Sequence, residues 1–340
     1  MSAIRVTGTG AVSPAGWGVE SLVTAVRDGA GLTEEVMERS HGGKTVTSRV
    51  LRVPQPVDRG VLPKHPRLRR GSPIARFAAA AAVEALGARR MAAVAAGELN
   101  LGVICTLMNG CVNYSNRFFA EVLADPSLAS PILFPETVFN APSSHLSALF
   151  GSTGVNDTLL GDSAAFLPAL EVAAEWIGRG EVDGCLVVGA EESDWLSTEG
   201  LGYYSRDYVA AEGAGAVFLE TADSGGVSLV SVPDAVSLAA GREAAARVLR
   251  EQLAVDDDGV TLLVDGRAGV ARWDRPEELA WAGWRGPRYS PRRILGEGMG
   301  VSAAWQMVMA VEALCAGEAD RAVLSVVGGN QQAAGAVLER

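Results

Sequence analysis

A serine between an aspartate and a predicted helix is the first candidate for chemistry in this sequence. Ser163 follows Leu159-Leu160-Gly161-Asp162, and the apolar periodicity after it predicts a helix over 164–177. A serine at a helix N-terminus can be acylated if a base lies within reach. It is also a common helix N-cap residue, and Pro168 would remove a backbone donor early in such a helix. The pattern favours the N-cap role and leaves the nucleophile role open.

Few side chains could assist that serine or hold a metal ion. The three histidines, His41, His65 and His145, lie far apart in the sequence. The four cysteines have no metal-ligand spacing, and a chain of 340 residues does not need a disulfide framework. We therefore expect no metal site and no cofactor.

Composition and charge narrow the class of protein. Hydrophobic residues make up 48% of the chain and charged residues 20%, with a formal net charge of -11. A phosphate-tracking surface needs a basic excess, so nucleic acid is not an expected partner. No apolar run reaches the roughly 18 residues of a membrane span, and the N-terminus predicts a strand rather than a signal peptide. The cytoplasm is the expected location, without membrane contact.

A short basic stretch stands out against this acidity. Lys64, Arg67, Arg69 and Arg70 lie within one Pro-containing segment. Such a segment is either a solvated loop or a docking point for an acidic partner.

Short apolar runs alternate with longer amphipathic patterns, which predicts an α/β protein with largely buried sheets. Strands are predicted over 4–7, 101–105, 185–188, 216–219, 227–232, 260–264, 322–327 and 336–338. Helices are predicted over 74–86, 164–177, 242–253, 276–284 and 302–316.

An internal repeat divides the chain. Gly180-Glu-Val-Asp183 follows a predicted helix and precedes a strand, and Gly317-Glu-Ala-Asp320 does the same later in the chain. Gly215-Ala-Val-Phe-Leu-Glu220 is likewise repeated by Gly335-Ala-Val-Leu-Glu339. The repeat predicts two similar α/β halves, residues 1–222 and 223–340, joined at the turn-forming stretch 222–226.

Several segments, in order, resemble the β-ketoacyl synthases of the thiolase superfamily. They are the serine turn 159–166, Val6 to Pro14, Phe134 to Pro142 with His145, Tyr208 to Ala216, and Gly328-Gly329-Asn330. The resemblance spans nearly the whole chain. It implies a thiolase-like fold of two duplicated α/β halves, with central mixed sheets in an α/β/α/β/α arrangement.

The departures from the family pattern bear on catalysis. The resemblance aligns Ser163 with the nucleophilic cysteine, Asp265 and Glu297 with the two catalytic histidines, and Val327 with the gating phenylalanine. Ionised carboxylates accept hydrogen bonds and would repel an enolate that the histidines stabilise. Neutral carboxylic acids could donate only if their pKa values were strongly raised. These four positions are therefore expected to be degenerate, and no catalytic residue is expected.

A ketosynthase-like chain without a nucleophile resembles a chain-length factor, although such proteins commonly have glutamine where this chain has Ser163. The resemblance implies a heterodimer with an active ketosynthase in a type II polyketide or polyene system. The growing acyl chain would lie in a shared tunnel, and an acyl carrier protein would be a second partner. Arg67, Arg69 and Arg70 are candidates for docking that carrier protein.

The resemblance also implies a helix at the dimer interface within 106–119. Helical spacing places Asn109, Val112, Asn113 and Asn116 on one face, with Met108 at the tunnel mouth. These side chains either stop the acyl chain or only form hydrogen bonds across the interface.

Two other functions stay open. One is a Ser163-dependent acyltransferase or hydrolase acting on carrier-protein thioesters, with Glu297 or Asp265 as base. The Gly-Asp-Ser string is similar to certain lipases, whose other sequence blocks are missing here. The other is an inert homodimer that acts as a scaffold.

Overall fold

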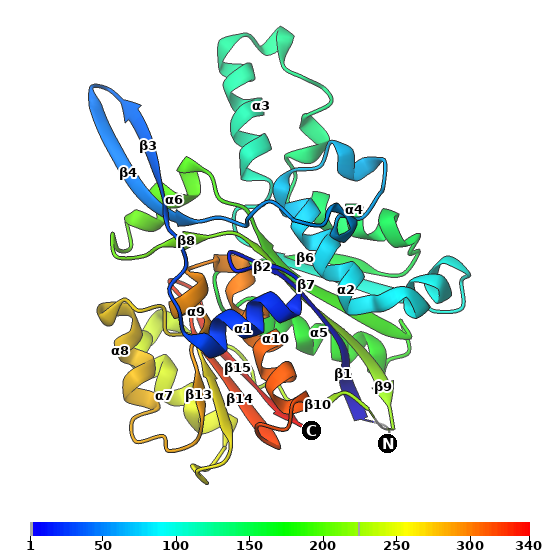
Figure 1. Ribbon diagram of the computed structural model, residues 1–340, viewed down its shortest axis with the longest axis vertical. Helices are drawn as coiled ribbons and strands as arrows, with labels where there is room; N and C mark the ends of the chain where they lie inside the picture. The colour runs from blue at the N-terminus through cyan, green and yellow to red at the C-terminus, as the bar shows by residue number, and fades with distance from the viewer. Residues whose placement is uncertain (1–2, 224) are drawn as a thin grey trace.

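A single mixed sheet dominates the computed structural model, which describes residues 3–223 and 225–340 (Figure 1). Its strands follow the order β13-β12-β14-β15-β10-β1-β9-β7-β5-β6, with β2 paired to β1 and β11 paired to β15. A second sheet has the order β3-β4-β8. The strands are β1 (Ala3–Ser13), β2 (Gly16–Trp17), β3 (Glu35–His41), β4 (Lys44–Leu51), β5 (Leu101–Leu107), β6 (Asn156–Leu160), β7 (Gly184–Glu191), β8 (Ala210–Ala211), β9 (Gly213–Ala222), β10 (Val227–Ser231), β11 (Val236–Ser237), β12 (Leu262–Asp265), β13 (Arg288–Tyr289), β14 (Arg321–Val327) and β15 (Gln332–Glu339). The helices are α1 (Val19–Asp28), α2 (Pro73–Ala95), α3 (Val112–Ala124), α4 (Ala141–Phe150), α5 (Phe166–Gly178), α6 (Trp195–Gly202), α7 (Arg242–Leu253), α8 (Ala271–Ala280), α9 (Pro291–Leu295) and α10 (Ser302–Cys315).

The strand pairings of the main sheet occur twice. In the run β1-β9-β7-β5-β6 the first two pairs are antiparallel and the last two parallel. The run β10-β15-β14-β12-β13 has the same sequence of pairings. The two runs join where Arg5 and Val6 of β1 pair with β10. The boundary at residue 222, between β9 and β10, stays a prediction.

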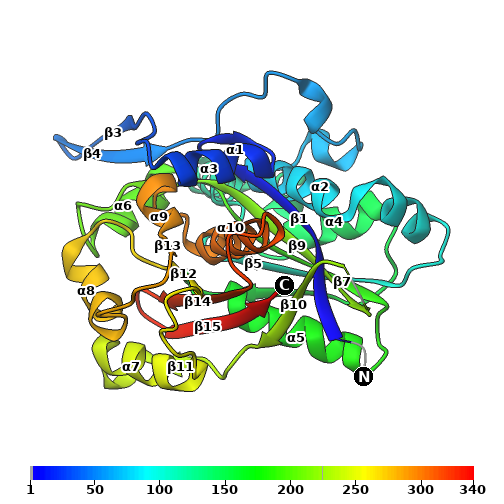
Figure 2. The same ribbon diagram turned by 60° about the horizontal axis from the view of Figure 1, so that its bottom comes forward.

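Helices separate and cover the two runs of strands (Figure 2). Between them lie α5 and α10, each of which contacts strands of both runs. Outside, α2 and α4 cover the first run, and α7 and α8 cover the second. The predicted α/β/α/β/α layering is confirmed. Because α10 lies in the middle, its residues 302–311 are all buried. Within the described ranges, no helix is long and apolar enough to cross a bilayer.

Some predicted elements were shifted or missed. The helix predicted over 276–284 is wrong in position, because α8 starts at Ala271 and Pro276 lies inside it. Turn chemistry sets this start, since the Asp274 carboxylate accepts the Ala268 and Gly269 N–H groups, each at 2.8 Å. The β3–β4 hairpin was missed because its strands are polar and mostly exposed, without the alternation of a half-buried strand.

Gly8 and Gly10 let β1 lie directly against α2. A Cβ atom at Gly10 would overlap the carbonyl oxygen of Ala81, and one at Gly8 would overlap that of Ala85.

We expect Gly10→Ala to lower the free energy of unfolding by about 3 kcal/mol, because the helix backbone would have to move. Urea denaturation measures this. Gly178→Ala is the control, since a Cβ there meets nothing within 4 Å. Equal costs for the two variants would contradict the proposed contact.

Candidate functional site

The turn between β6 and α5 carries Ser163. Helix α5 begins at Phe166 with Ala165 as its N-cap, so the prediction that Ser163 caps the helix is wrong. The Asp162 carboxylate accepts the Ala164 N–H at 3.2 Å and thereby supports an extra turn before the helix. Pro168 becomes the third helical residue, where its N–H would have had no intrahelical partner. The proline is therefore compatible with this start.

The Ser163 hydroxyl is hydrogen-bonded within the protein. It donates to Glu297 Oε1 at 3.0 Å, and both side chains are buried. The same oxygen accepts the Met299 N–H at 2.7 Å and the Ser302 hydroxyl at 3.0 Å. Glu297 Oε2 forms a buried ion pair with Arg292. The carboxylate of Glu297 is thus charge-balanced and surrounded by donors, which opposes its use as a general base for Ser163.

Asp265 does not line the cavity at Ser163. Its fully buried carboxylate accepts the Arg267 side-chain Nε–H at 2.9 Å and forms an ion pair with Arg288. Burial and the Asp265 charge together raise the pKa of nearby Glu277 to about 8. Only one of the two carboxylates that align with the family's histidines, Glu297, therefore contacts Ser163.

The cavity at Ser163 has a volume of about 30 Å³. A cavity of this volume has room for about two water molecules, so an acyl thioester does not fit. Its walls come from both halves of the sequence: Met108, Asp162, Ser163, Leu201, Tyr204, Tyr208, Trp273, Arg292, Glu297, Met299, Gly329 and Asn330. No cysteine or histidine is among these described lining residues.

Val327, which aligns with the gating phenylalanine, lies away from that cavity. It is buried in a core cluster with Leu263 and Trp281. The loop after it is held instead by Asp162, whose carboxylate accepts the Asn330 N–H at 3.0 Å and the Gln331 N–H at 3.3 Å. Sequence reasoning missed this role of Asp162. The glycine at 328 was the available signal, because a Cβ there would overlap the Asp162 carboxylate.

The proposed tunnel residues are only partly helical. Helix α3 begins at Val112, so Met108 and Asn109 precede it, and the prediction of one helical face starting at Asn109 is wrong. The buried Glu191 carboxylate accepts the Met108 N–H at 2.9 Å and the Asn109 N–H at 3.0 Å. These bonds, with left-handed Gly110, hold the segment as a turn. Burial raises the pKa of Glu191 to about 8.

Two of the asparagines face their own chain. Asn113 Nδ2 donates to the Ser193 carbonyl at 3.4 Å, and Asn116 Nδ2 donates to the Asp194 carboxylate at 3.1 Å. The Asn113 backbone N–H also donates to Glu192 Oε1 at 2.8 Å. The start of α3 is thus fixed by acidic residues at the end of β7, which the sequence analysis did not single out.

Farther along, α3 projects from the body of the molecule (Figure 1). Phe119 and Leu123 lie one helical turn apart and are 61% and 73% exposed. The following segment adds further exposed apolar side chains, which are Leu128, Ile132, Phe134, Val138 and Phe139. We call Phe119, Leu123 and these five residues the α3 apolar surface. Exposed apolar side chains gathered in this way typically mark a protein interface.

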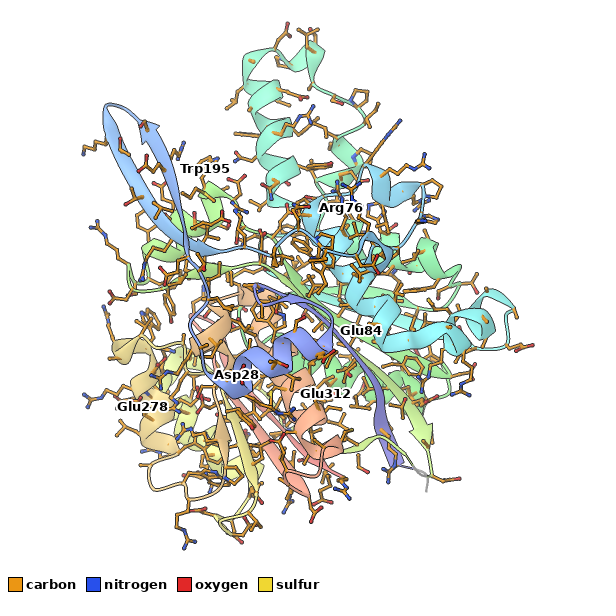
Figure 3. All side chains as sticks on the ribbon, in the orientation of Figure 1. Asp28, Arg76, Glu84, Trp195, Glu278 and Glu312 are labelled. Atoms are coloured by element: carbon orange, nitrogen blue, oxygen red, sulfur yellow. The ribbon has the colours of Figure 1, made fainter. Side chains whose placement is uncertain are left out.

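The basic stretch is exposed at Arg67, Arg69 and Arg70. Beside it lies a hollow of about 460 Å³, whose described lining has no acidic residue. Arg76, at the start of α2, contributes from the helix side (Figure 3). The lining is Arg59, Leu62, Pro63, Lys64, His65, Pro66, Leu68, Arg69 and Arg76. This charge suits an anionic partner.

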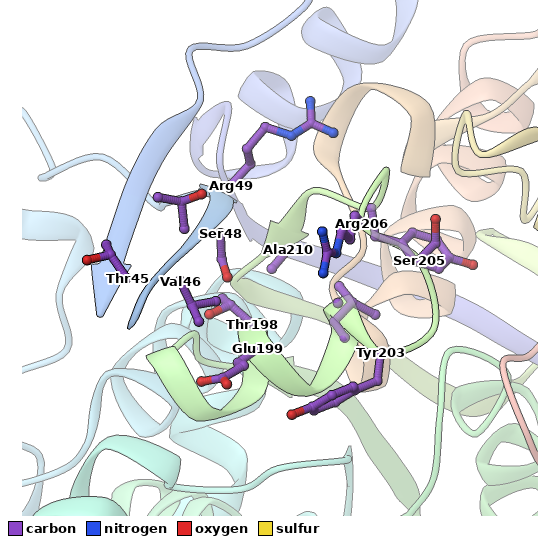
Figure 4. Close-up of a pocket in the computed structure, with 14 residues that line it drawn as sticks. Thr45, Val46, Ser48, Arg49, Thr198, Glu199, Tyr203, Ser205, Arg206 and Ala210 are labelled. Carbon is purple, nitrogen blue, oxygen red and sulfur yellow. The ribbon is translucent and has the colours of Figure 1, made fainter. Parts of the chain in front are cut away.

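A second hollow, of about 500 Å³, lies between β4, α6 and the segment 202–208 (Figure 4). Hydroxyl groups of Ser48 and Thr198 and the guanidinium of Arg206 line it. Leu201 and Tyr208 line both this hollow and the Ser163 cavity, so they form the wall between the two. Across the described chain, no group of three His, Cys, Asp or Glu residues is placed to hold a metal ion.

Comparisons with known proteins agree with this architecture. The profile of the β-ketoacyl synthase N-terminal domain matches residues 1–224. The ishigamide ketosynthase/chain length factor is 22% identical, with a TM-score of 0.81 over 99% of both chains. The AntDE ketosynthase, solved with its type II PKS acyl-carrier protein AntF and bound to the hexaketide, is 18% identical, with a TM-score of 0.78 over 99% of both chains. The ketosynthase ApeO in complex with its chain length factor ApeC from Xenorhabdus doucetiae is 15% identical, with a TM-score of 0.79 over 99% of this chain and 98% of that one. A search of curated proteins found no match.

Proposed function

Because this chain belongs to the β-ketoacyl synthase family, we propose that it is a chain-length factor, the non-condensing partner of an active ketosynthase in type II polyketide biosynthesis. One observation carries the proposal: Ser163 is bonded to a Glu297–Arg292 ion pair in a cavity of about 30 Å³. Acyl transfer and decarboxylation would need a thiolate, imidazole donors and room for the thioester. The proposed place of action is the cytoplasm.

The α3 apolar surface is the proposed contact with the ketosynthase. Strand β6 ends the order of the main sheet, and Leu160 at its end is 52% exposed. An open sheet edge and an exposed apolar helix are both suited to a partner of similar fold. Met108, Asn109, Val112, Asn113 and Asn116 would form one wall of the shared tunnel. Because Asn113 and Asn116 are bonded to their own chain, that wall would be rigid.

The acyl carrier protein is the second proposed partner. Arg67, Arg69 and Arg70 are exposed, and Arg59 and Arg76 extend their positive charge into the adjacent hollow. Carrier proteins of this family are acidic, so the basic hollow is complementary to them.

Co-expression with the ketosynthase encoded beside it tests the proposed function. We expect a one-to-one heterodimer by size-exclusion chromatography with light scattering, and polyketide product only when both chains are present. Introducing Phe119→Asp together with Leu123→Asp should weaken pairing at least about 30-fold, because each buries a charge at the interface. Leu279→Asp, at a 53% exposed position on α8, is the matched control.

Three results would oppose the proposal. A homodimer with no affinity for the ketosynthase would favour the scaffold hypothesis. Condensation by the chain alone would remove the non-condensing role. An acyl adduct on Ser163, seen by mass spectrometry after incubation with acyl carrier protein thioesters, would favour the acyltransferase or hydrolase.

A further inference from the structure

Met299 has an unfavourable backbone conformation. Its φ is +48°, and among the described residues Ala254 is the other non-glycine at positive φ. For a side chain larger than glycine, this conformation costs on the order of 1 kcal/mol. Glycines occupy both neighbouring positions, 298 and 300. A methionine in such a place calls for a role of its side chain.

That side chain stands between Ser163 and the start of α3. Met299 lines the Ser163 cavity together with Met108. On the α3 side its sulfur accepts the Asn109 Nδ2–H at 3.2 Å. Its backbone N–H donates to the same Glu297 oxygen that accepts the Ser163 hydroxyl. A thioether chain is flexible and polarizable, and fills irregular space of this kind well.

Aromatic side chains close the opposite wall of the cavity. Trp273 packs against Tyr204 with ring centroids 5.8 Å apart and against Tyr208 at 6.1 Å. Asn330 Nδ2 donates to the Tyr204 hydroxyl at 3.0 Å, and the Arg242 guanidinium lies 4.2 Å from the Trp273 ring centroid. This wall is tied by several contacts. On the α3 side the cavity is lined by Met108, which a bond to Glu191 holds, and by Met299, whose backbone is strained.

We propose that Met299 is a stopper that keeps a linear acyl chain, passing the start of α3, from entering the Ser163 cavity. That the excluded group is an acyl chain rests on the proposed function. That Met299 closes the Ser163 cavity does not. A growing acyl chain would then have one path, through the partner's site and along α3. Met299 would be a specificity-determining residue of the tunnel, in addition to the residues of the α3 segment.

Thiol accessibility tests the closure without any partner. The Ser163→Cys change is made with Cys315→Ser, because Cys315 is the exposed cysteine among four and the other three are buried. Iodoacetamide labelling is followed by intact-protein mass spectrometry. We expect Met299→Gly to speed labelling of the introduced thiol at least tenfold, because it removes the stopper and relieves the positive φ. Met299→Ala is a second variant should the glycine variant fold poorly. The Glu297 carboxylate stays beside the thiol throughout, so the ratio of rates reports access.

Two results would overturn the proposal. One is an introduced thiol that already reacts as fast as Cys315 does in the unmodified protein. The other is a rate unchanged by both Met299 variants but raised by Tyr204→Ala, which would assign the closure to the aromatic wall. Met37→Ala is the control, since Met37 shares a core cluster with Met299 but does not line the cavity. If the protein pairs with no ketosynthase, the proposed function fails. The labelling rates still test whether Met299 closes the Ser163 cavity, because they need no partner.

Discussion

Replacing Arg292 by methionine should lower the free energy of unfolding by about 3–5 kcal/mol, among the largest effects available in this protein. Both Arg292 and Glu297 are 4% exposed, so the lost guanidinium would leave a carboxylate buried without a counter-charge. Arg292 also donates to the Gly266 carbonyl, which would lose its donor. Urea denaturation followed by tryptophan fluorescence measures the change, provided that the denaturant slope is unaltered.

A second substitution separates charge from packing. Glu297→Gln added to Arg292→Met removes the unpaired charge, and the double variant should recover at least about half of the loss. The surface pair Arg179–Glu175, 63% and 53% exposed, provides the control. Arg179→Met should cost no more than about 0.5 kcal/mol. Equal costs at the two sites would contradict the buried ion pair.

Glu277→Gln should remove much of the pH dependence of stability between mildly acidic and mildly alkaline pH. Burial and the Asp265 charge raise the pKa of Glu277 from 4.5 to about 8. Between those values the folded protein keeps a proton that the unfolded chain releases. The contribution of Glu277 to the free energy of unfolding is therefore most favourable below pH 4.5. It is lost as the pH rises to about 8, with a slope of about 1.4 kcal/mol per pH unit. Glutamine is neutral throughout and has no such slope.

Urea denaturation at pH 5, 6.5 and 8 compares this variant with the unchanged protein. The free energy of unfolding of Glu277→Gln should rise relative to that of the unchanged protein by about 4 kcal/mol over that range. Glu191, whose pKa is also raised, adds the same background slope to both proteins. Glu278→Gln, at a 51% exposed neighbouring side chain, is the control and should follow the unchanged protein. Parallel curves for all three would show that Glu277 is ionised when folded.

The layered fold could be predicted because its signals are local and repeated. The apolar runs that became β5, β7, β9 and β14 are buried strands of the kind that periodicity identifies. The family resemblance carried by the segments around Ser163 was confirmed. The polar β3–β4 hairpin and the true start of α8 depended on contacts outside these runs. Apolar periodicity does not report such contacts.

The candidate site was predictable in part. Alignment brought Ser163 and Glu297 to the same place, and the structure joins them by a hydrogen bond. Arg292 was not singled out although its partner Glu297 lies only five residues away, because apolar periodicity does not report an ion pair. The role of Asp162 was missed because Asn330, whose N–H it accepts, lies 168 residues away. The start of α3 was misplaced for the same reason, since Glu191 lies 82 residues from Asn109. Helical spacing cannot show that the backbone N–H groups of Met108 and Asn109 donate to a carboxylate from a strand and not to carbonyls of a helix.

The burial of α10 on all sides over residues 302–311 also bears on how such a chain can change during evolution. Residues 302–311 have no solvent-facing side on which substitutions would be neutral, so each change among them must suit both runs of strands at once. Recombination that exchanged one half for that of a relative would pack this helix against a run of strands with different side chains. The two halves are therefore expected to evolve together, although each repeats the same order of strand pairings.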